Sequence, residues 1–307
     1  MNPSAQAPQT AADDARSGSD LIARIEALWV YPIKSCAGVA LTESEITIDG
    51  LLWDRNWMVV DRDGEAITQR EAPRMALIQT DFRMGALRVR APGMLPLHLS
   101  LDSAEAQTRV RLWGEELGAY EMGAVAAQWF TDFLGASDPS LGPLRLVRFD
   151  PEHDRHCDPA WTGETPSTTQ FADGFGFLLT SSASLAEFNR RLTEGGFAGI
   201  DQRRFRPNIV LSGLDAHGED LIGRWSIDAG EAPVLLDNVK PCSRCQIPDV
   251  DPDSAATGDA VGEVLLAYRR DTRIGGSPSF GMNAVLREGA GTIIRVGQTV
   301  RASLKFD

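Results

Sequence analysis

The sequence predicts an α+β fold that is predominantly antiparallel β. Short runs in which apolar and polar residues alternate recur along most of the chain, and turn signals such as Asp49-Gly50 separate them. Clear helical spacing of apolar side chains is confined to residues 124–134 and 182–192. This rhythm of many short strands and few helices is typical of an antiparallel sheet or barrel.

The first half of the chain is predicted to be almost entirely β. The opening strand, 22–31, mixes β-branched, aromatic and charged residues, and Pro32 ends it because proline has no N–H to donate to a neighbouring strand. The helix at 124–134 ends at Gly135, a residue type that often follows a helix. Further strands are expected at 39–48, 57–60, 76–82, 87–89, 97–101 and 108–112.

The second half places one helix among several strands. Ser182 is the expected N-cap of the helix at 182–192, since a serine hydroxyl accepts a hydrogen bond from a free N–H of the first turn. Residues 150–170 are polar and contain prolines, and 249–262 are rich in Asp and Gly, so both are predicted to be loops. Strands are expected at 144–149, 208–212, 234–238, 264–268, 284–286 and 292–295.

Length and composition indicate two modules. The chain has 307 residues, of which 43% are hydrophobic, which allows a substantial core and exceeds the common length of one domain. Residues 1–20 are rich in Ala, Ser, Gln, Asp and Pro and are predicted to be a disordered tail. The expected modules are residues 21–140 and 141–307.

The net charge argues against two classes of partner, and the cysteine content favours one cellular location. A net charge of −13 repels phosphate backbones and anionic lipid headgroups, so neither nucleic acid nor a membrane is expected as a partner. The first 20 residues lack the features of a signal peptide, and no apolar run approaches the roughly 18 residues of a membrane helix. Four cysteines do not make a disulfide scaffold and fit a reducing cytoplasm, which is the expected location.

The sharpest local motif is the pair Cys242 and Cys245, which follows a predicted strand. A thiolate is a metal ligand and a nucleophile, and the neighbouring Arg244 favours that charged form. Four interpretations stay open. A structural zinc site lacks two further ligands, a redox dithiol would open a helix although Pro248 follows closely, and the cysteines could be inert and buried. The fourth is a single thiolate that holds a metal within a cofactor.

Basic residues in two other motifs could bind an anion. Lys34 and Ser35 follow a strand-ending proline and offer a charge and a hydroxyl to a phosphate, although a surface turn also explains them. Arg203, Arg204 and Arg206 crowd into four positions, which indicates either an anion site or a solvated charge run.

The remaining candidates have simpler explanations. Asp54 is expected to form an ion pair with an arginine on a strand face, and residues 171–175 a turn before a strand. His153, His156 and Cys157 lie in a loop rich in Pro and Asp without apolar support, so no metal site is expected there.

Seven stretches of the sequence carry a resemblance to a known family. In order they read LWVYPIKSC, DGLLWDRNWMVVD, TQREAPRMALI, FADGF, FRPNIV, KPCSRCQIPDVDPDSAATG and SFGMNA. Together they resemble the MOSC-domain proteins with an N-terminal MOSC-type β-barrel module, and are similar to the mitochondrial amidoxime-reducing component and its bacterial relatives. One such stretch would be weak support, whereas seven in the same order, from about Ile22 to the C-terminus, are specific.

The resemblance implies an N-terminal β-barrel-like module packed on a MOSC β-barrel with a few helices, and a molybdenum–molybdopterin cofactor between them. It implies that Cys245 binds the metal, that Cys242 has no assigned metal role, and that Asp173 lies beside the metal as a proton donor or an orienting group. Gly174 and Phe175 would contribute backbone contacts only. The positions that match the family's cofactor-binding residues are Lys34, Ser35, Arg55, Gly174, Phe175, Arg206, Asn208, Ser243, Arg244 and Asn283.

The activity implied by the resemblance is reduction of hydroxylamines, amidoximes or N-hydroxylated bases, with oxygen removal at molybdenum held by Cys245. Two alternatives are a carrier of cofactor or sulfur with a persulfide on Cys245, and a binding protein without catalysis. No cysteine follows Cys245, so an iron–sulfur cluster is not expected in this chain. Electrons would then come from a separate ferredoxin-type protein, or from a cytochrome plus its reductase, to a small-molecule substrate. The mitochondrial location is not carried over, because no leader or membrane anchor is recognised.

Overall fold

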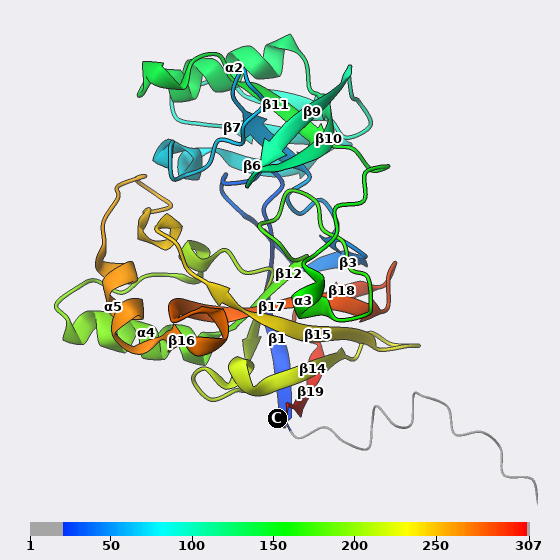
Figure 1. Cartoon of the computed structure of the whole chain (residues 1–307), viewed down its shortest axis with the longest axis vertical. Helices are drawn as coiled ribbons and strands as arrows, with labels where there is room; N and C mark the ends of the chain where they lie inside the picture. The colour runs from blue at the N-terminus through cyan, green and yellow to red at the C-terminus, as the bar shows by residue number, and fades with distance from the viewer. Residues whose placement is uncertain (1–20, 306–307) are drawn as a thin grey trace, which may run out of the picture.

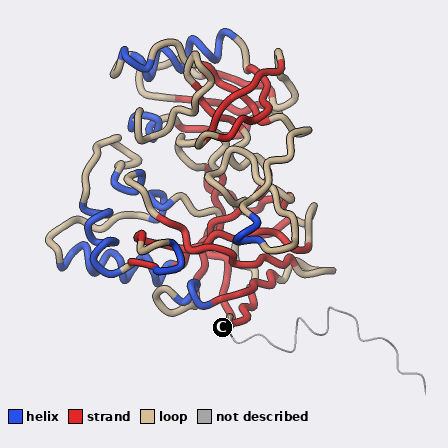
Figure 2. The backbone as a smooth tube through the Cα atoms, in the orientation of Figure 1, coloured by secondary structure: helices blue, strands red, loops and turns tan. Residues whose placement is uncertain are grey.

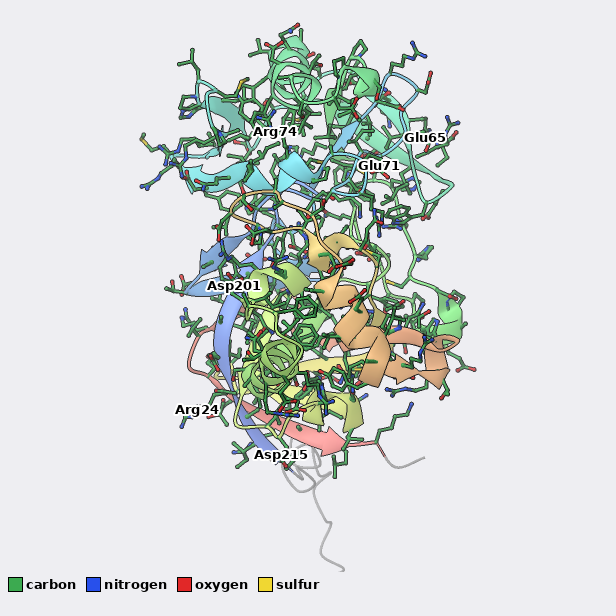
Figure 3. All side chains as sticks on the ribbon, turned by 90° about the vertical axis from the view of Figure 1, so that its left-hand side faces the viewer. Arg24, Glu65, Glu71, Arg74, Asp201 and Asp215 are labelled. Atoms are coloured by element: carbon green, nitrogen blue, oxygen red, sulfur yellow. The ribbon has the colours of Figure 1, made fainter. Side chains whose placement is uncertain are left out.

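The computed structural model describes residues 21–305, and the predicted disordered tail at 1–20 lies outside the described residues. The chain forms an upper lobe, which holds β5 to β11 and α2, and a lower lobe, which holds the remaining strands and the other α-helices (Figure 1). Strands fill the centre of both lobes (Figure 2). In a view turned by 90°, Glu71 and Arg74 lie in the upper lobe and Asp201 and Asp215 in the lower one (Figure 3). The predicted α+β class, predominantly antiparallel, is confirmed.

A closed barrel of seven strands forms the centre of the lower lobe. Phe177 of the first strand in the wall pairs with Ala284 of the last one and closes the barrel. Neighbouring strands are antiparallel except for β12 and β13. In their order around the wall, the strands are β12 (Phe177–Ser181), β13 (Ile209–Ser212), β1 (Leu21–Val30), β19 (Thr299–Leu304), β14 (Ile222–Ile227), β15 (Val234–Ser243) and β17 (Ser277–Glu288).

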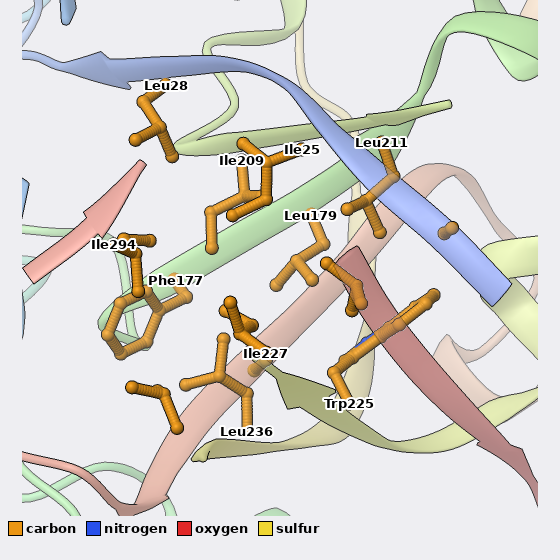
Figure 4. Close-up of a cluster of buried hydrophobic side chains, with 14 of the residues drawn as sticks. Ile25, Leu28, Phe177, Leu179, Ile209, Leu211, Trp225, Ile227, Leu236 and Ile294 are labelled. Atoms are coloured by element: carbon orange, nitrogen blue, oxygen red, sulfur yellow. The ribbon is translucent and has the colours of Figure 1, made fainter. Parts of the chain in front are cut away.

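Apolar side chains fill the interior of this barrel. In β1, buried and more exposed residues alternate, as a strand with one face on a core requires. Ile25, Leu28, Phe177, Trp225 and Leu236 come from four different strands and converge in the interior (Figure 4), each at most 1% exposed. Each such side chain stabilises the fold by about 1.5–3 kcal/mol relative to an exposed one.

Additional strands and helices cover the barrel. One group of short strands extends its wall or borders it: β2 (Val39–Leu41), β3 (Glu43–Thr47), β4 (Gly50–Leu51), β16 (Arg270–Asp271) and β18 (Ile293–Arg295). Helices α4 (Ser182–Glu194) and α5 (Ala260–Tyr268) pack against each other beside it (Figure 1). Their shared core contains Phe188, Leu265 and the stacked rings of Phe205 and Phe280.

The upper lobe consists of two small sheets and one helix. Its four-stranded sheet is β5 (Trp57–Val60), β11 (Arg145–Phe149), β10 (Glu115–Glu121) and β9 (Gln107–Leu112), and its three-stranded sheet is β6 (Gln79–Arg83), β7 (Ala86–Arg90) and β8 (Leu97–Ser100). Helix α2 (Ala124–Gly135) buries Trp129, Phe130 and Phe133 against them. The short helices of the described chain are η1 (Pro73–Leu77), η2 (Pro139–Leu141), α3 (Pro159–Thr162), η3 (Gln202–Phe205), η4 (Gly218–Leu221), η5 (Ile247–Asp249) and η6 (Thr272–Ile274).

One predicted strand, 264–268, is wrong, because these residues form the second half of helix α5. The run of apolar residues fits either structure, and a distant carboxylate decides between them. Asp249 accepts hydrogen bonds from the N–H groups of Val261 and Gly262, at 2.8 Å and 3.2 Å, and so caps the start of the helix.

Other differences are smaller. The cap of helix α4 is Ser181, not Ser182, since the Ser181 hydroxyl accepts the N–H of Ser184. The segment 76–82 begins inside η1, where Pro73 starts a tight turn, and only its end is strand. The expected strand 39–48 is divided into β2 and β3, and α3 interrupts the expected loop at 150–170. Strands β10, β14 and β19 were not predicted: β10, for example, carries three glutamates that hide its buried centre.

The domain division at residue 140 stays a prediction. Strand β1 precedes the whole upper lobe in sequence and yet lies in the barrel of the lower lobe, between β13 and β19. No helix within residues 21–305 combines the length and the apolar character that crossing a membrane requires.

Candidate functional site

A pocket lies where the two lobes meet. All twelve residues that the sequence analysis proposed for a site line it: Lys34, Ser35, Arg55, Asp173, Gly174, Phe175, Arg206, Asn208, Ser243, Arg244, Cys245 and Asn283. Further residues also line it, among them Arg204 and Cys242, which belong to candidate motifs of the sequence, and Arg70 and Phe205. The structure therefore brings together side chains that are up to 249 positions apart in the sequence, from Lys34 to Asn283.

The barrel topology explains why these segments converge. Residues 31–35 leave the end of β1, and Asn208 directly precedes β13, the strand beside β1. Strand β15 ends at Ser243, and its neighbour β17 carries Asn283 opposite Lys240 of β15 and Leu178 of β12. Strand ends and register positions on one side of the barrel thus supply most of the pocket wall.

Unusual backbone conformations accompany the pocket. Ser35, Arg55 and Arg206 have φ values of 66°, 50° and 57°, in the left-handed region that non-glycine residues seldom adopt. They are three of the eight such residues in the described chain. Conformations of this kind concentrate at functional sites, because the surrounding structure must hold them in place.

The pocket is strongly cationic in a chain whose net charge is −13. Among the described residues that line it, one side chain is a carboxylate, Asp173, and six are cations: Lys34, Arg55, Arg70, Arg204, Arg206 and Arg244. Such a concentration of one sign of charge attracts an anion of the opposite sign.

Arg206 has no carboxylate partner among residues 21–305. Its Nη1 donates to the carbonyl oxygen of Cys36 at 2.7 Å, and its Nη2 is buried with no hydrogen-bond partner among the described residues. Burial, together with the nearby charge of Arg55, lowers the pKa of Arg206 to about 10. A buried guanidinium without a counter-ion destabilises the folded state unless a bound anion pairs with it.

Arg244 is held by backbone carbonyls. It donates to Phe280 O through Nε and Nη2, at 3.0 Å and 2.6 Å, and to Phe205 O through Nη1 at 3.0 Å. These contacts fix the guanidinium without neutralising its charge, since carbonyl groups carry only dipoles. Arg244 and Arg206 together give the pocket two fixed charges that suit a phosphate.

Arg55 is part of the ion pair that the sequence predicted at Asp54. Its Nη1 lies 2.5 Å from Asp54 Oδ2, and both side chains are largely buried, at 13% and 3% exposed. Asp54 Oδ1 also accepts the N–H of Tyr31 at 2.8 Å, and Arg55 stacks over the Tyr31 ring. The pair therefore fixes the turn after β1 as well as the position of a pocket cation.

We expect Asp54→Ala to lower the free energy of unfolding by about 3–5 kcal/mol, because it leaves Arg55 buried without its partner. The matched control is Glu116→Ala, which removes the partner of Arg109 from an ion pair exposed at 67% and 61% and should change stability little. Urea unfolding of both variants measures the difference. Equal small losses would mean that the Asp54–Arg55 pair does not hold this turn.

Cys245 is exposed at the pocket, and its sulfur accepts a hydrogen bond from Arg70 Nη2 at 3.0 Å. Cys242 is partly buried, and burial raises the pKa of its thiol although the charge of Arg244 opposes this. The two thiols are therefore not equivalent: Cys245 is the more exposed, and its sulfur accepts a hydrogen bond from an arginine. Within residues 21–305, no three His, Cys, Asp or Glu side chains gather as a metal site.

Asp173 forms an ion pair with Lys34 at 2.5 Å, and Lys34 Nζ also donates to Phe171 O at 2.8 Å. Burial lowers the pKa of Lys34, and Asp173 opposes this effect. Desolvation acts to raise the pKa of Asp173, but the charge and hydrogen bond of Lys34 outweigh it and hold that pKa well below its usual range. Asp173 is therefore ionised at neutral pH and accepts hydrogen bonds.

Comparison with known families matches residues 22–137 to the MOSC N-terminal beta barrel domain and residues 166–301 to the MOSC domain. The chain belongs to the MOSC family. Among the relatives of this MOSC protein is the mitochondrial amidoxime-reducing component 1 of Homo sapiens, 35% identical over 91% of this chain and 82% of that one. The mitochondrial amidoxime reducing component 2 of Rattus norvegicus is 34% identical over 81% of this chain and 73% of that one.

A third relative has a different name. The molybdenum cofactor sulfurase of Homo sapiens is 28% identical over 91% of this MOSC protein, which corresponds to 32% of the sulfurase. This chain thus matches about a third of that longer protein. The names of the first two relatives refer to amidoxime reduction, and the name of the third refers to the molybdenum cofactor.

Two residues in or beside this site received no role from the sequence, although Arg70 was noted near the Asp54–Arg55 motif. Arg70 lies in one of the seven resembling stretches, but a single arginine in a turn carries no chemical signal until its contact with Cys245 is seen. Trp113 lies at the tip of the β9–β10 hairpin, where its ring packs against Arg70 at 4.6 Å and Lys34 at 5.5 Å. Because β10 was not predicted, the hairpin that carries Trp113 could not be placed.

Proposed function

We propose that this MOSC protein is a molybdenum-cofactor-dependent reductase of N-hydroxylated compounds, with Cys245 as the metal ligand. The observation that carries the proposal is an exposed thiol in a pocket lined by six cations and one carboxylate among the described residues. The names of the amidoxime-reducing relatives, which cover most of this chain, support the reaction type.

The residues present fit an anionic cofactor with sulfur donors. The unpartnered Nη2 of Arg206, the fixed guanidinium of Arg244, and the Lys34–Ser35 turn would bind its phosphate. Cys245 offers the soft thiolate that suits a metal already held by sulfur. When bound, the cofactor supplies the two-electron chemistry that removes oxygen from an N–OH group.

The chain's own side chains position this chemistry. Arg70 donates to the sulfur of Cys245 and so fixes the orientation of the thiolate. Lys34 donates to Asp173 Oδ1 and lowers the pKa of that carboxylate, which favours the orienting role over proton donation. Of the two roles that the resemblance implied for Asp173, the structure thus supports one.

A carrier of cofactor or sulfur is the second candidate function. The match to the molybdenum cofactor sulfurase and the accessibility of Cys245, which could bear a persulfide, favour it. The two functions differ in turnover. A reductase converts N-hydroxy substrate repeatedly with molybdenum bound, whereas a carrier releases its cargo once.

The purified chain alone is expected not to oxidise NADH in the presence of benzamidoxime. The sequence has no Gly-x-Gly-x-x-Gly motif, and its four cysteines are divided between two buried positions and the pocket pair. A reduced viologen, which needs no docking site, should support reduction in proportion to molybdenum content, and a ferredoxin-type protein or cytochrome with its reductase should restore NADH dependence. Oxidation of NADH by the isolated chain with substrate would contradict the need for a separate donor.

The cytoplasmic location also stays a proposal. The amidoxime-reducing relatives are named as mitochondrial proteins, so their names do not favour it. Fractionation of cells that express the full chain tests the location directly.

A further inference from the structure

One carboxylate oxygen of Asp173, in the pocket lining, has no hydrogen-bond donor among the described residues. Its Oδ1 accepts from Lys34, and no described residue donates to its Oδ2. The side chain is 67% exposed, so this second oxygen is open to a ligand. In a lining with six cations, Asp173 is the one group among the described residues that can bind positive charge through a formal charge of its own.

Asp173 lines the same pocket as Cys245 and Arg70, and Arg70 Nη2 donates to Cys245 Sγ at 3.0 Å. Trp113, 51% exposed, packs against Arg70 and against Lys34, the partner of Asp173. Trp113 thus holds Lys34 and Arg70 in place, while Asp173 contributes to the pocket of Cys245 a carboxylate that suits a ligand with positive charge and N–H donors.

Reduction of N-hydroxy compounds creates such a cation in some cases and not in others. An amidoxime takes up two electrons from the donor and two protons, its N–O bond breaks, water leaves, and the amidine that forms binds one more proton. A hydroxamic acid takes up the same electrons and protons and yields water and a neutral amide. Positive charge thus develops on the reacting group of the amidoxime alone.

We propose that Asp173 Oδ2 accepts a hydrogen bond from the NH2 group of the substrate and stabilises the positive charge that develops there. Asp173 then determines specificity: the site favours N-hydroxyamidines and N-hydroxyguanidines, whose products are cations, over N-hydroxy compounds whose products are neutral. This inference rests on the proposed reductase function. Interactions that strengthen as charge develops lower the barrier as well as improving binding.

The test compares two substrates of the same shape in the molybdenum-loaded enzyme, with reduced viologen as the donor. For Asp173→Asn, kcat/KM for benzamidoxime should fall about tenfold to a hundredfold more than kcat/KM for benzhydroxamic acid. The amide keeps the size of the side chain, and any general damage from the loss of the Lys34 ion pair affects both substrates. The ratio of the two kcat/KM losses therefore reports the effect of the negative charge of Asp173.

Asp251→Asn is the matched control. Asp251 pairs with Arg204, another cation of the pocket lining, at 2.8 Å, and does not line the pocket itself. This variant removes an equal charge near the site and should change the two substrates alike. A substrate ratio in Asp173→Asn that equals the ratio in Asp251→Asn overturns the proposal.

A binding measurement gives a second readout that does not depend on turnover. Calorimetry with loaded protein should show that the wild type binds benzamidine at least about tenfold more tightly than benzamide, and that Asp173→Asn removes this preference. Equal affinities in the wild type overturn the proposal. If the preference is present but no N-hydroxy compound is reduced, the reductase function fails while Asp173 is still shown to bind the cation.

Discussion

Cys245→Ser is expected to abolish reductase activity, with a loss larger than the roughly 10–100-fold that changes beside a metal ligand cause. The sulfur of Cys245 is exposed in the pocket and receives the guanidinium of Arg70 at 3.0 Å. A serine hydroxyl is a harder and far less acidic donor, so it does not replace a thiolate on a metal held by sulfur. The measurement is the rate of benzamidoxime reduction with reduced viologen.

Cys242→Ser is the matched control, three residues away in the same motif. Its thiol is partly buried, and burial raises its pKa, which disfavours the thiolate that a metal ligand needs. Most of the activity should therefore remain. Equal losses in the two variants, together with zinc in the wild type, would point to a zinc or dithiol site and contradict a single thiolate ligand.

Arg206→Ala is expected to reduce cofactor occupancy more than it reduces folding stability. The lost interaction is a charge-assisted hydrogen bond to a phosphate, worth about 1.5–3 kcal/mol. The folded chain loses the Nη1 contact with Cys36 O and the packing on the Tyr31 ring at 4.2 Å but no ion pair, and Nη2 has no hydrogen-bond partner among the described residues. Removing a buried charge that lacks a counter-ion also relieves a desolvation cost.

Arg203→Ala provides the control from the same arginine run. Arg203 is 36% exposed and pairs with Asp201 and Asp253 outside the pocket lining. It should leave occupancy close to the wild-type level. Cofactor content, measured on both variants beside a thermal melt, decides the matter. Normal occupancy in Arg206→Ala with a much earlier melt would identify Arg206 as a structural residue.

The fold class and most of the pocket residues could be predicted from the sequence, because both can be recognised from patterns within short stretches of residues. Alternation in β1 marks a strand with one buried face, and the resembling stretches around Lys34, Arg206 and Cys245 stand at strand ends that the barrel brings together. The strand pattern alone left a sheet and a barrel both open, and the resemblance supplied the barrel, since the closing pair of β12 with β17 joins residues about a hundred positions apart, such as Phe177 and Ala284.

The errors share a physical cause, which is that a distant contact decided a local structure. The helix at α5 depends on the Asp249 carboxylate, 12 residues before the N–H of Val261 that it receives. The role of Arg70 is visible only from its hydrogen bond to the sulfur of Cys245, 175 positions later in the sequence. Spacing along the chain contains no information about such contacts. The stretches that contain Arg70 and Cys245 could therefore be recognised from the sequence, but the hydrogen bond between these two residues could not.

The metal content of the purified chain, measured by mass spectrometry, is the direct test of Cys245 as the metal ligand. We expect about one molybdenum atom per wild-type chain and much less in Cys245→Ser, because the thiolate is the protein's own bond to the metal. Arg206 and Arg244, which are proposed to bind the cofactor's phosphate, are present in both proteins, so the difference reports on the sulfur. Labile sulfur without molybdenum, or zinc in its place, in wild-type protein made by cells that synthesise the cofactor would contradict the account.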